Sequence, residues 1–176
     1  MKITFKGTPI MLVGLFPKNG EKAPDFTLVK NDMSEYSLKE GKGSYLILNI
    51  FPSLDTGVCA NTVRRFNQMA ASLPQTQVLC ISKDLPFAQK RFCVAEGIDR
   101  VIPLSDFRPT SHFGEKYGVL IANGPMQGLL ARAVVVISPE GKVVYAELVS
   151  EVTDEPNYEE VLKVIDPSLA PKDVSQ

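Results

Sequence analysis

The sequence predicts an α/β protein in which helices flank a central mixed sheet. Nearly unbroken apolar runs of strand length alternate with segments whose apolar residues recur at helical spacing. The last part of the chain is predicted to be an antiparallel hairpin followed by a helix. A length of 176 residues with 44% hydrophobic content suits one domain, residues 1–176, with a sizeable core.

We expect residues 1–16 to form a β-hairpin rather than a cleaved signal segment. Two lysines precede an apolar stretch, residues 9–16, that imitates the hydrophobic part of a signal peptide. Residues 2–6, however, alternate polar and apolar side chains as a strand does, and residues 18–22 offer no small-x-small cleavage site. No run approaches the roughly 18 apolar residues of a membrane span, so we expect a soluble protein with no membrane partner.

Two strands are predicted to be covered on both faces. Residues 45–51 and 77–82 are nearly unbroken apolar runs, which is typical of central strands between layers of helices. Pro52 ends the first run. Shorter strands are expected at residues 26–29, 36–38, 101–104, 129–137 and 143–149, with a hairpin turn at residues 139–141.

A helix is predicted after each of these two strands. Between Val58 and Leu73 the apolar residues recur at helical spacing, and Asp55 or Thr56 can cap the first turn. The next helix opens near Pro86 and is closed by Gly97. A helical turn at residues 110–117, a last helix at residues 158–165 and a loose tail at residues 166–176 complete the order. This order matches a thioredoxin-like fold with an N-terminal hairpin extension.

Charge and cysteine content exclude several classes of function. Nineteen basic and twenty acidic residues leave a net charge of -1 without a basic block, so nucleic acid is not an expected partner. The three cysteines, Cys59, Cys80 and Cys93, contain no CxxC pair and do not form a disulfide scaffold. With a single histidine, a structural zinc site is not expected, and the absence of CxxC disfavours a disulfide isomerase.

Cys59 is the candidate reactive thiol. It ends the run of residues 52–59, directly after a predicted strand and at the start of a predicted helix. A helix N-terminus lowers the pKa of a thiol because its unpaired N–H groups and positive dipole end favour the thiolate, which is the nucleophilic form. The alternative is that Cys59 is a small buried hydrophobic residue, as most free cysteines are.

Arg132 is a second candidate, because it interrupts the apolar sequence of residues 129–136. A guanidinium buried there without a partner would be costly, so it needs an anion or access to solvent. A thiolate at Cys59 would supply the anion, and Arg132 would in return depress the thiol pKa. The alternative is an arginine at a strand end that reaches water or a surface carboxylate.

The spacing PxxxTxxC, formed by Pro52, Thr56 and Cys59, resembles the peroxidatic motif of the peroxiredoxins. Together with residues 85–93 and 128–133, the stretch 51–59 is similar to the bacterial thiol peroxidase subfamily, the atypical two-cysteine peroxiredoxins. The resemblance implies that Cys59 is the peroxidatic cysteine. Thr56 lies three residues before Cys59, so on a helical first turn its hydroxyl can bond to the sulfur and the peroxide as well as cap the helix. We expect Pro52, which has no donor, to shape and dry the pocket rather than to transfer protons.

The resemblance further implies that Cys93 is the resolving cysteine and that Arg132 is the catalytic arginine. From spacing alone, Cys93 would be considered structural. Its helical neighbours at three and four positions are not apolar, so we expect it to lie off the core stripe and to be accessible. Cys80, between two apolar residues of a strand, is assigned to the core. If the two reactive cysteines lie further apart than a disulfide allows, one or both helices must unwind locally.

The implied activity is the reduction of hydrogen peroxide and organic hydroperoxides to water and alcohols, without a metal or organic cofactor. The resemblance implies a sulfenic acid on Cys59, an intramolecular disulfide with Cys93, and recycling by thioredoxin. It also implies a homodimer in the bacterial cytoplasm. Two alternatives stay open: a thiol-based peroxide sensor that relays oxidation to a partner protein, and a thioredoxin-fold interaction module with an ordinary Cys59 thiol.

Overall fold

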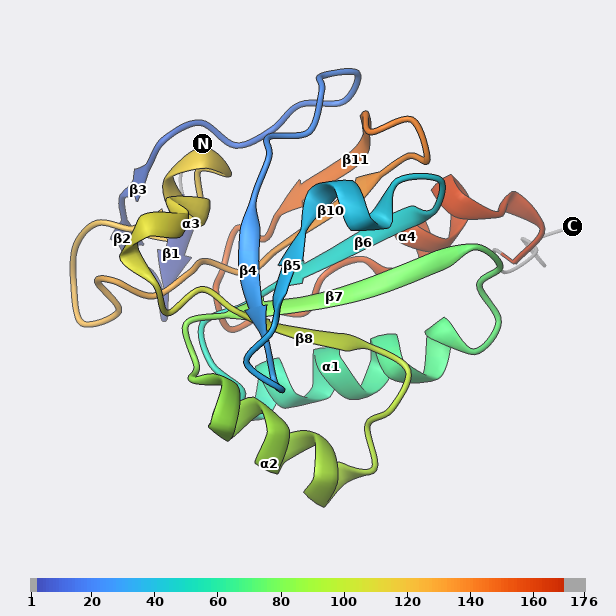
Figure 1. The fold of residues 1–176 in the computed structure, drawn as a ribbon. Helices are drawn as coiled ribbons and strands as arrows, with labels where there is room; N and C mark the ends of the chain where they lie inside the picture. The colour runs from blue at the N-terminus through green and yellow to red at the C-terminus, as the bar shows by residue number, and fades with distance from the viewer. Residues whose placement is uncertain (1–2, 170–176) are drawn as a thin grey trace, which may run out of the picture.

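A computed structural model describes residues 3–169 and contains one seven-stranded sheet with two small two-stranded sheets beside it (Figure 1). The strand order in the large sheet is β11-β10-β6-β7-β8-β4-β5. Its strands are β4 (Thr27–Lys30), β5 (Glu35–Ser37), β6 (Tyr45–Ile50), β7 (Thr76–Ser82), β8 (Ile102–Ser105), β10 (Ala133–Ile137) and β11 (Val143–Leu148). The α-helices are α1 (Gly57–Ala70), α2 (Pro86–Glu96), α3 (Phe113–Lys116) and α4 (Tyr158–Ile165).

The large sheet is mixed, as the sequence predicts. Strands β6, β7 and β8 are parallel to one another, and the outer strands pair antiparallel on both sides of them. Parallel strands need crossover connections, which α1 supplies between β6 and β7 and α2 supplies between β7 and β8. The carboxyl ends of β6 and β7 therefore meet at one edge of the sheet, where α1 and α2 begin.

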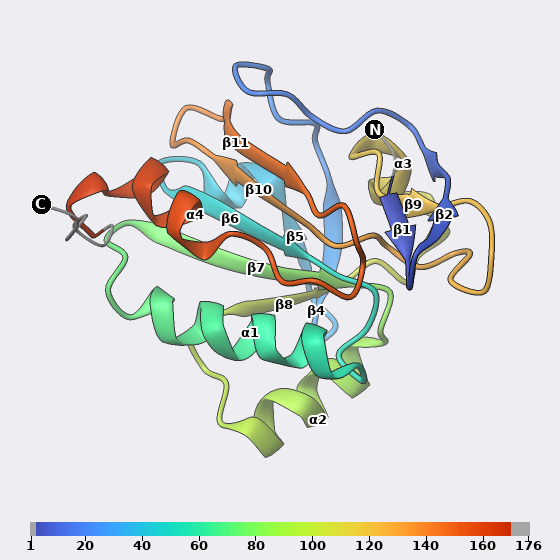
Figure 2. The same cartoon turned by 180° about the vertical axis from the view of Figure 1, so that it is seen from behind.

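The two faces of the sheet bury separate hydrophobic clusters. On β6, Ile47 belongs to the cluster beneath α1 and α4, whereas Leu48 and Ile50 belong to the cluster on the opposite face. This alternation follows from the two-residue period of a strand, and it explains why the run shows no polar face in the sequence. Figure 2 shows α1 and α4 packed on the first face.

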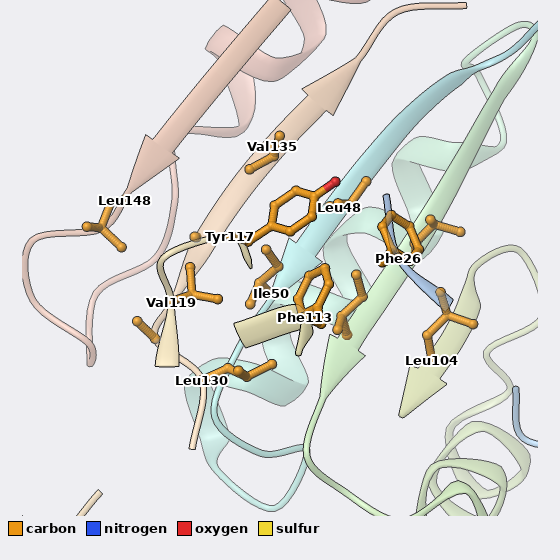
Figure 3. Packing of buried hydrophobic residues seen from close by; sticks show 14 of the residues in the cluster. Phe26, Leu48, Ile50, Leu104, Phe113, Tyr117, Val119, Leu130, Val135 and Leu148 are labelled. Atoms are coloured by element: carbon orange, nitrogen blue, oxygen red, sulfur yellow. The ribbon is translucent and has the colours of Figure 1, made fainter. Parts of the chain in front are cut away.

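Aromatic residues from the segment around α3, together with Phe26 just before β4, cover the opposite face. Phe113 and Tyr117 stack with ring centroids 4.6 Å apart, and Phe26 meets both rings edge-on. Figure 3 shows these three rings against Leu48 and Ile50 of β6. Both faces of the central strands are thus sealed from water, which fixes the positions of the loops at their ends.

The N-terminal hairpin extension is present and is joined to the body of the protein. Strands β1 (Ile3–Phe5) and β2 (Thr8–Ile10) pair antiparallel, and β3 (Leu12–Val13) pairs with β9 (Leu120–Ile121). Thr4 exchanges backbone hydrogen bonds with the segment after β11: its N–H donates to the Ser150 carbonyl at 2.8 Å, and its carbonyl accepts from the Val152 N–H at 2.9 Å.

One predicted strand is shorter than expected. The sequence predicts a strand over residues 129–137, but β10 begins only at Ala133. Residues 129–131 bond instead to the segment near β9, because the Ala131 N–H donates to the Val119 carbonyl and the Ile121 N–H to the Leu129 carbonyl. Arg132 consequently lies at the entry to β10, between two different sheets.

The remaining boundaries agree with the predictions to within a few residues. Helix α4 has the predicted bounds, and α2 ends at Gly97 in the left-handed conformation, at φ 65°. The predicted loose tail, residues 166–176, lies mostly outside the described residues. Its described part contains a 3-10 turn at Pro167–Leu169. Within residues 3–169, none of the helices has the length and apolar character that crossing a membrane requires.

Candidate active site

The loop between β6 and α1 places Cys59 in the first turn of α1. Thr56 is the N-cap in an extended conformation, and its Oγ1 accepts a hydrogen bond from the Cys59 backbone N–H at 3.3 Å. The prediction that Thr56 caps this helix is therefore confirmed. Cys59 is the third residue of α1 and its side chain is fully buried, at 0% exposure.

Arg132 meets the sulfur of Cys59 from the entry of β10. Its Nη2 donates to Cys59 Sγ at 3.1 Å, and its Nε donates to the Val152 carbonyl at 2.7 Å. The side chain is only 2% exposed, and Nη1 has no hydrogen-bond partner within the described part of the chain. The fold thus brings together two residues that lie 73 positions apart in the sequence.

In the part of the chain that the structure describes, no carboxylate balances the charge of this arginine. Among residues 3–169, Arg132 forms no ion pair with an aspartate or glutamate. An unpaired buried cation is costly, by several kcal/mol in the protein interior. Cys59 Sγ is the one side-chain atom in this part of the chain that bonds to the guanidinium, so it is the group that can supply a compensating negative charge.

The Thr56 hydroxyl is oriented differently from the prediction. It donates to the Ser53 carbonyl at 3.3 Å, and within residues 3–169 it makes no hydrogen bond to the sulfur. Pro52, which precedes this turn, is buried. The loop is thus folded back on itself, and the Cys59 sulfur faces the guanidinium rather than the threonine hydroxyl.

The expectation that Cys93 is accessible is wrong. Cys93 is only 8% exposed and lies in the last turns of α2, on a buried stripe with Pro86 and Gln89. The prediction failed because Gln89, although polar, is fully buried: its Nε2 donates to the Leu104 carbonyl at 2.9 Å. Burial raises the pKa of the Cys93 thiol to about 11.

Cys93 nevertheless borders a groove of about 310 Å³ at the surface. The end of α2 is held against α1 by the ion pair between Arg64 and Glu96, with Arg64 Nε 2.9 Å from Glu96 Oε2. The Arg100 backbone N–H also donates to the Asn67 side chain at 2.7 Å. These contacts join the end of α2 and the loop that follows it to the middle of α1, beyond its first turn.

Cys80 lies in the core, as predicted. It is 2% exposed on β7, and its Sγ accepts from the Asn49 side-chain amide at 3.6 Å. Burial raises the pKa of this thiol to about 12. All three cysteines are free thiols, so the structure is that of the reduced chain.

Asp84 and Val152 contact the site and were not singled out in the sequence. Asp84, between β7 and α2, accepts hydrogen bonds from the loop before Cys59, and Val152 supplies the carbonyl that orients Arg132. A signal for Asp84 existed, since it follows a strand whose carboxyl end meets that of β6. No group of three His, Cys, Asp or Glu side chains in residues 3–169 is placed as a metal site requires.

Comparison with known proteins decides the family. The redoxin family model matches residues 18–162. A thiol peroxidase of Mycobacterium tuberculosis is 54% identical over 164 residues, which cover 93% of this chain and 98% of that protein. The chain belongs to the thiol peroxidases of the redoxin family. A thiol peroxidase of Corynebacterium glutamicum is 50% identical over the same shares of the two chains.

Solved structures agree with the fold of this thiol peroxidase. A peroxiredoxin-like protein from Aquifex aeolicus superposes with a TM-score of 0.88 at 43% identity, over 94% of this chain and 96% of the other. A thiol peroxidase from Chromobacterium violaceum gives a TM-score of 0.86 at 22% identity, over 96% and 97% of the two chains. The predicted thioredoxin-like fold is confirmed, because both structures superpose on this chain over nearly their whole length.

Proposed function

We propose that Cys59 is the residue at which this thiol peroxidase reduces hydrogen peroxide and organic hydroperoxides. The observation that carries the proposal is the buried contact of 3.1 Å between Arg132 Nη2 and Cys59 Sγ. A guanidinium at this distance favours the thiolate, which is the nucleophilic form of cysteine. The unpartnered Nη1 of the same guanidinium leaves a donor for a peroxide oxygen.

The first step is a nucleophilic displacement on the peroxide. The Cys59 thiolate attacks the terminal, hydrogen-bearing oxygen, so that a sulfur–oxygen bond forms as the oxygen–oxygen bond breaks. Sulfur loses two electrons and becomes a sulfenic acid, and the leaving oxygen takes up a proton to give an alcohol or water. Arg132 stabilises the charge that develops on the oxygens, and the buried Pro52 excludes water from the sulfur.

The second step forms a disulfide with Cys93. The Cys93 sulfur attacks the oxidised sulfur of Cys59, a sulfur–sulfur bond forms, and the hydroxyl leaves as water with the proton of Cys93. Cys93 is buried on α2 with a raised pKa, and its helix is held against α1 beyond the turn that carries Cys59. The step therefore needs local unwinding of one or both helices.

A dithiol must then reduce the disulfide, and we assign this role to thioredoxin. Exchange with its two thiols transfers two electrons and two protons and restores both cysteines. The bacterial cytoplasm keeps a thioredoxin pool reduced, so we place the reaction there. A homodimer is supported by apolar surface at the start of α2, where Leu85 is 53% exposed and Phe87 is 66% exposed.

The proposal is tested by NADPH consumption with thioredoxin, thioredoxin reductase and a hydroperoxide. Cys59→Ser is expected to abolish peroxide reduction, and Cys93→Ser to allow a single oxidation without recycling. Cys80→Ser serves as the matched control and should retain activity, because Cys80 is packed in the core and its sulfur bonds to Asn49 rather than to the guanidinium. Full turnover by Cys59→Ser would overturn the assignment.

One observation favours a second function, that of a peroxide sensor. Burial of Cys93 and its pKa of about 11 slow the attack on the sulfenic acid, which gives a partner protein time to react with oxidised Cys59. Slow turnover with thioredoxin, combined with fast mixed-disulfide formation with a partner, would favour the sensor over the peroxidase cycle.

A further inference from the structure

One carboxylate joins the loop before Cys59 to the loop before α2. Asp84 Oδ1 accepts from the Ser53 hydroxyl at 2.8 Å, and Asp84 Oδ2 accepts from the Leu54 backbone N–H at 2.8 Å. Both donors lie between Pro52 and the N-cap Thr56. Hydrogen bonds to an ionised acceptor are stronger than those between neutral groups, so the two contacts restrain this loop firmly.

This carboxylate supplies the hydrogen bonds that hold the loop from outside, in addition to the burial of Pro52 and Leu54. Every other hydrogen bond that the structure shows for residues 52–56 within residues 3–169 is made inside the loop or to the first turn of α1. The Thr56 backbone N–H, for example, donates to the Ser53 carbonyl at 3.3 Å. Without its bonds to Asp84, the loop keeps no hydrogen bond to the sheet within residues 3–169. The nearest such bond is at Phe51, whose N–H donates to the Ile81 carbonyl at 3.1 Å.

Asp84 itself is held by the ends of two strands. Its Oδ2 accepts from the Ser82 hydroxyl at 2.7 Å, and its backbone carbonyl accepts from the Ser105 hydroxyl. Gln89 donates to Ser82 at 3.2 Å and to the Leu104 carbonyl at 2.9 Å, which fixes the serine in turn. The carboxylate is thus a fixed point on the sheet, and the loop is the part that can move relative to it.

The turn of α1 that follows the loop is weakly stabilised on its own. It begins with Gly57 and has no acidic residue in its first turn. The Thr62 hydroxyl donates to the Cys59 carbonyl at 2.8 Å and so competes for an acceptor of the helical ladder. A turn of this kind stays helical as long as the preceding loop is restrained, and it unwinds readily once the loop is free.

We propose that the Asp84 carboxylate is a positioning residue that sets the balance between the two states of the active site. With Ser53 and Leu54 bound to it, Cys59 is held against Arg132 for attack on the peroxide. When the two bonds break, the first turn of α1 unwinds and Cys59 becomes able to reach Cys93. This inference rests on the proposed roles of the two cysteines.

The decisive property of such a restraint is that it affects two rates in opposite directions. Asp84→Ala is expected to slow sulfenic acid formation on Cys59 about tenfold and to speed disulfide formation with Cys93 about tenfold, which corresponds to about 1.4 kcal/mol in each barrier. Asp84→Asn keeps the size of the side chain and one acceptor oxygen, so its effects should have the same signs and be smaller. Overoxidation of Cys59 by excess peroxide should decrease in both variants, because the sulfenic acid is consumed sooner.

The test is stopped-flow oxidation of the reduced full-length protein by hydrogen peroxide. The first rate is measured with a sulfenic acid probe in a Cys93→Ser background, and the second from the loss of free thiols after a stoichiometric pulse of peroxide. Ser53→Ala removes one of the two restraints and should shift both rates in the same directions as Asp84→Asn. Glu140→Gln removes an exposed carboxylate from the β10–β11 turn and serves as the control for loss of charge.

The outcomes separate the inference from the proposed function. Opposite changes in the two rates support the positioning role of Asp84. Equal decreases in both rates, as a general loss of packing would cause, or unchanged rates in folded Asp84→Asn, overturn it and leave the roles of Cys59 and Cys93 intact. Absence of sulfenic acid on Cys59 after peroxide treatment of Cys93→Ser with Asp84 intact would overturn the proposed function, and the inference with it.

Discussion

Replacement of Arg132 by methionine tests the electrostatic part of the account. Methionine keeps much of the length of the side chain but removes the charge that lies 3.1 Å from Cys59 Sγ. Two opposite unit charges about 4 Å apart attract by about 4 kcal/mol at an effective dielectric constant of 20. Because each 1.4 kcal/mol is a factor of ten, the full attraction corresponds to about three orders of magnitude.

Water that enters the space left by the guanidinium would recover part of this energy. We therefore expect the second-order rate constant for hydrogen peroxide to fall between about 100- and 1000-fold in Arg132→Met, when stopped-flow oxidation of the reduced protein is measured at neutral pH. Arg132→Lys keeps the charge but loses the fork of donors to the sulfur and to Val152, so its decrease should be smaller. A rate for Arg132→Met within threefold of the wild type would refute the reasoning.

Three further predictions follow from the same geometry. Cys59→Ser leaves the buried Arg132 without an anion, so the unfolding free energy of this variant should fall by about 2 kcal/mol and its Tm by about 4–8 °C. In calorimetry, the double variant with Arg132→Met should recover part of this loss. A further decrease in the double variant would contradict the pairing. The pKa of the Cys93 thiol is about 11 in the folded protein and about 9 ordinarily, so the folded state holds this proton up to a higher pH than the unfolded state does. The stability that this thiol contributes is therefore fully present below pH 9 and is lost as the pH rises through 11. Denaturant unfolding of Cys93→Ser should show a shallower alkaline loss, and an identical pH profile would count against burial of this thiol. Thr56→Val removes the N-cap of α1 and should lower the unfolding free energy by about 1 kcal/mol, whereas Thr56→Ser keeps the capping hydroxyl and should lower it by less. Equal unfolding free energies for the two variants would be inconsistent with the cap.

The sequence predicted the core of the site because its signals are local. The apolar run of β6, the proline that ends it and the capping threonine together place Cys59 in the first turn of a helix. Arg132 was recognised because a cation inside an apolar stretch demands a partner. Both features depend on neighbouring residues, so they could be identified before the structure was known.

The surroundings of Cys93 could not be read in this way. The buried face of α2 contains the polar residue Gln89, whereas the apolar Phe87 and Val94 are 66% and 76% exposed. The spacing of apolar residues therefore does not predict which face of this helix packs against the sheet. What decides the face is the bond from Gln89 to the Leu104 carbonyl on β8, which is a tertiary contact. The late start of β10 has a similar cause, because Ala131 bonds to Val119 rather than to the large sheet.

The role of Asp84 was also outside the reach of sequence patterns. Its position after β7 places it at the same edge of the sheet as Cys59, but only the structure shows that its two oxygens accept from Ser53 and Leu54. Which groups bond to each other depends on the paths of the loop before α1 and the loop before α2, and a periodic pattern in the sequence does not predict these paths.

The central claim is that the sulfur of Cys59 is ionised in the reduced, folded protein because Arg132 lies against it. The most direct measurement is the ultraviolet absorbance of the thiolate during a pH titration of the reduced wild type, with Cys59→Ser as the reference. The account predicts that the difference between the two proteins corresponds to one full thiolate at neutral pH and that this difference disappears in Arg132→Met. A wild type whose Cys59 remains a protonated thiol at neutral pH would contradict it.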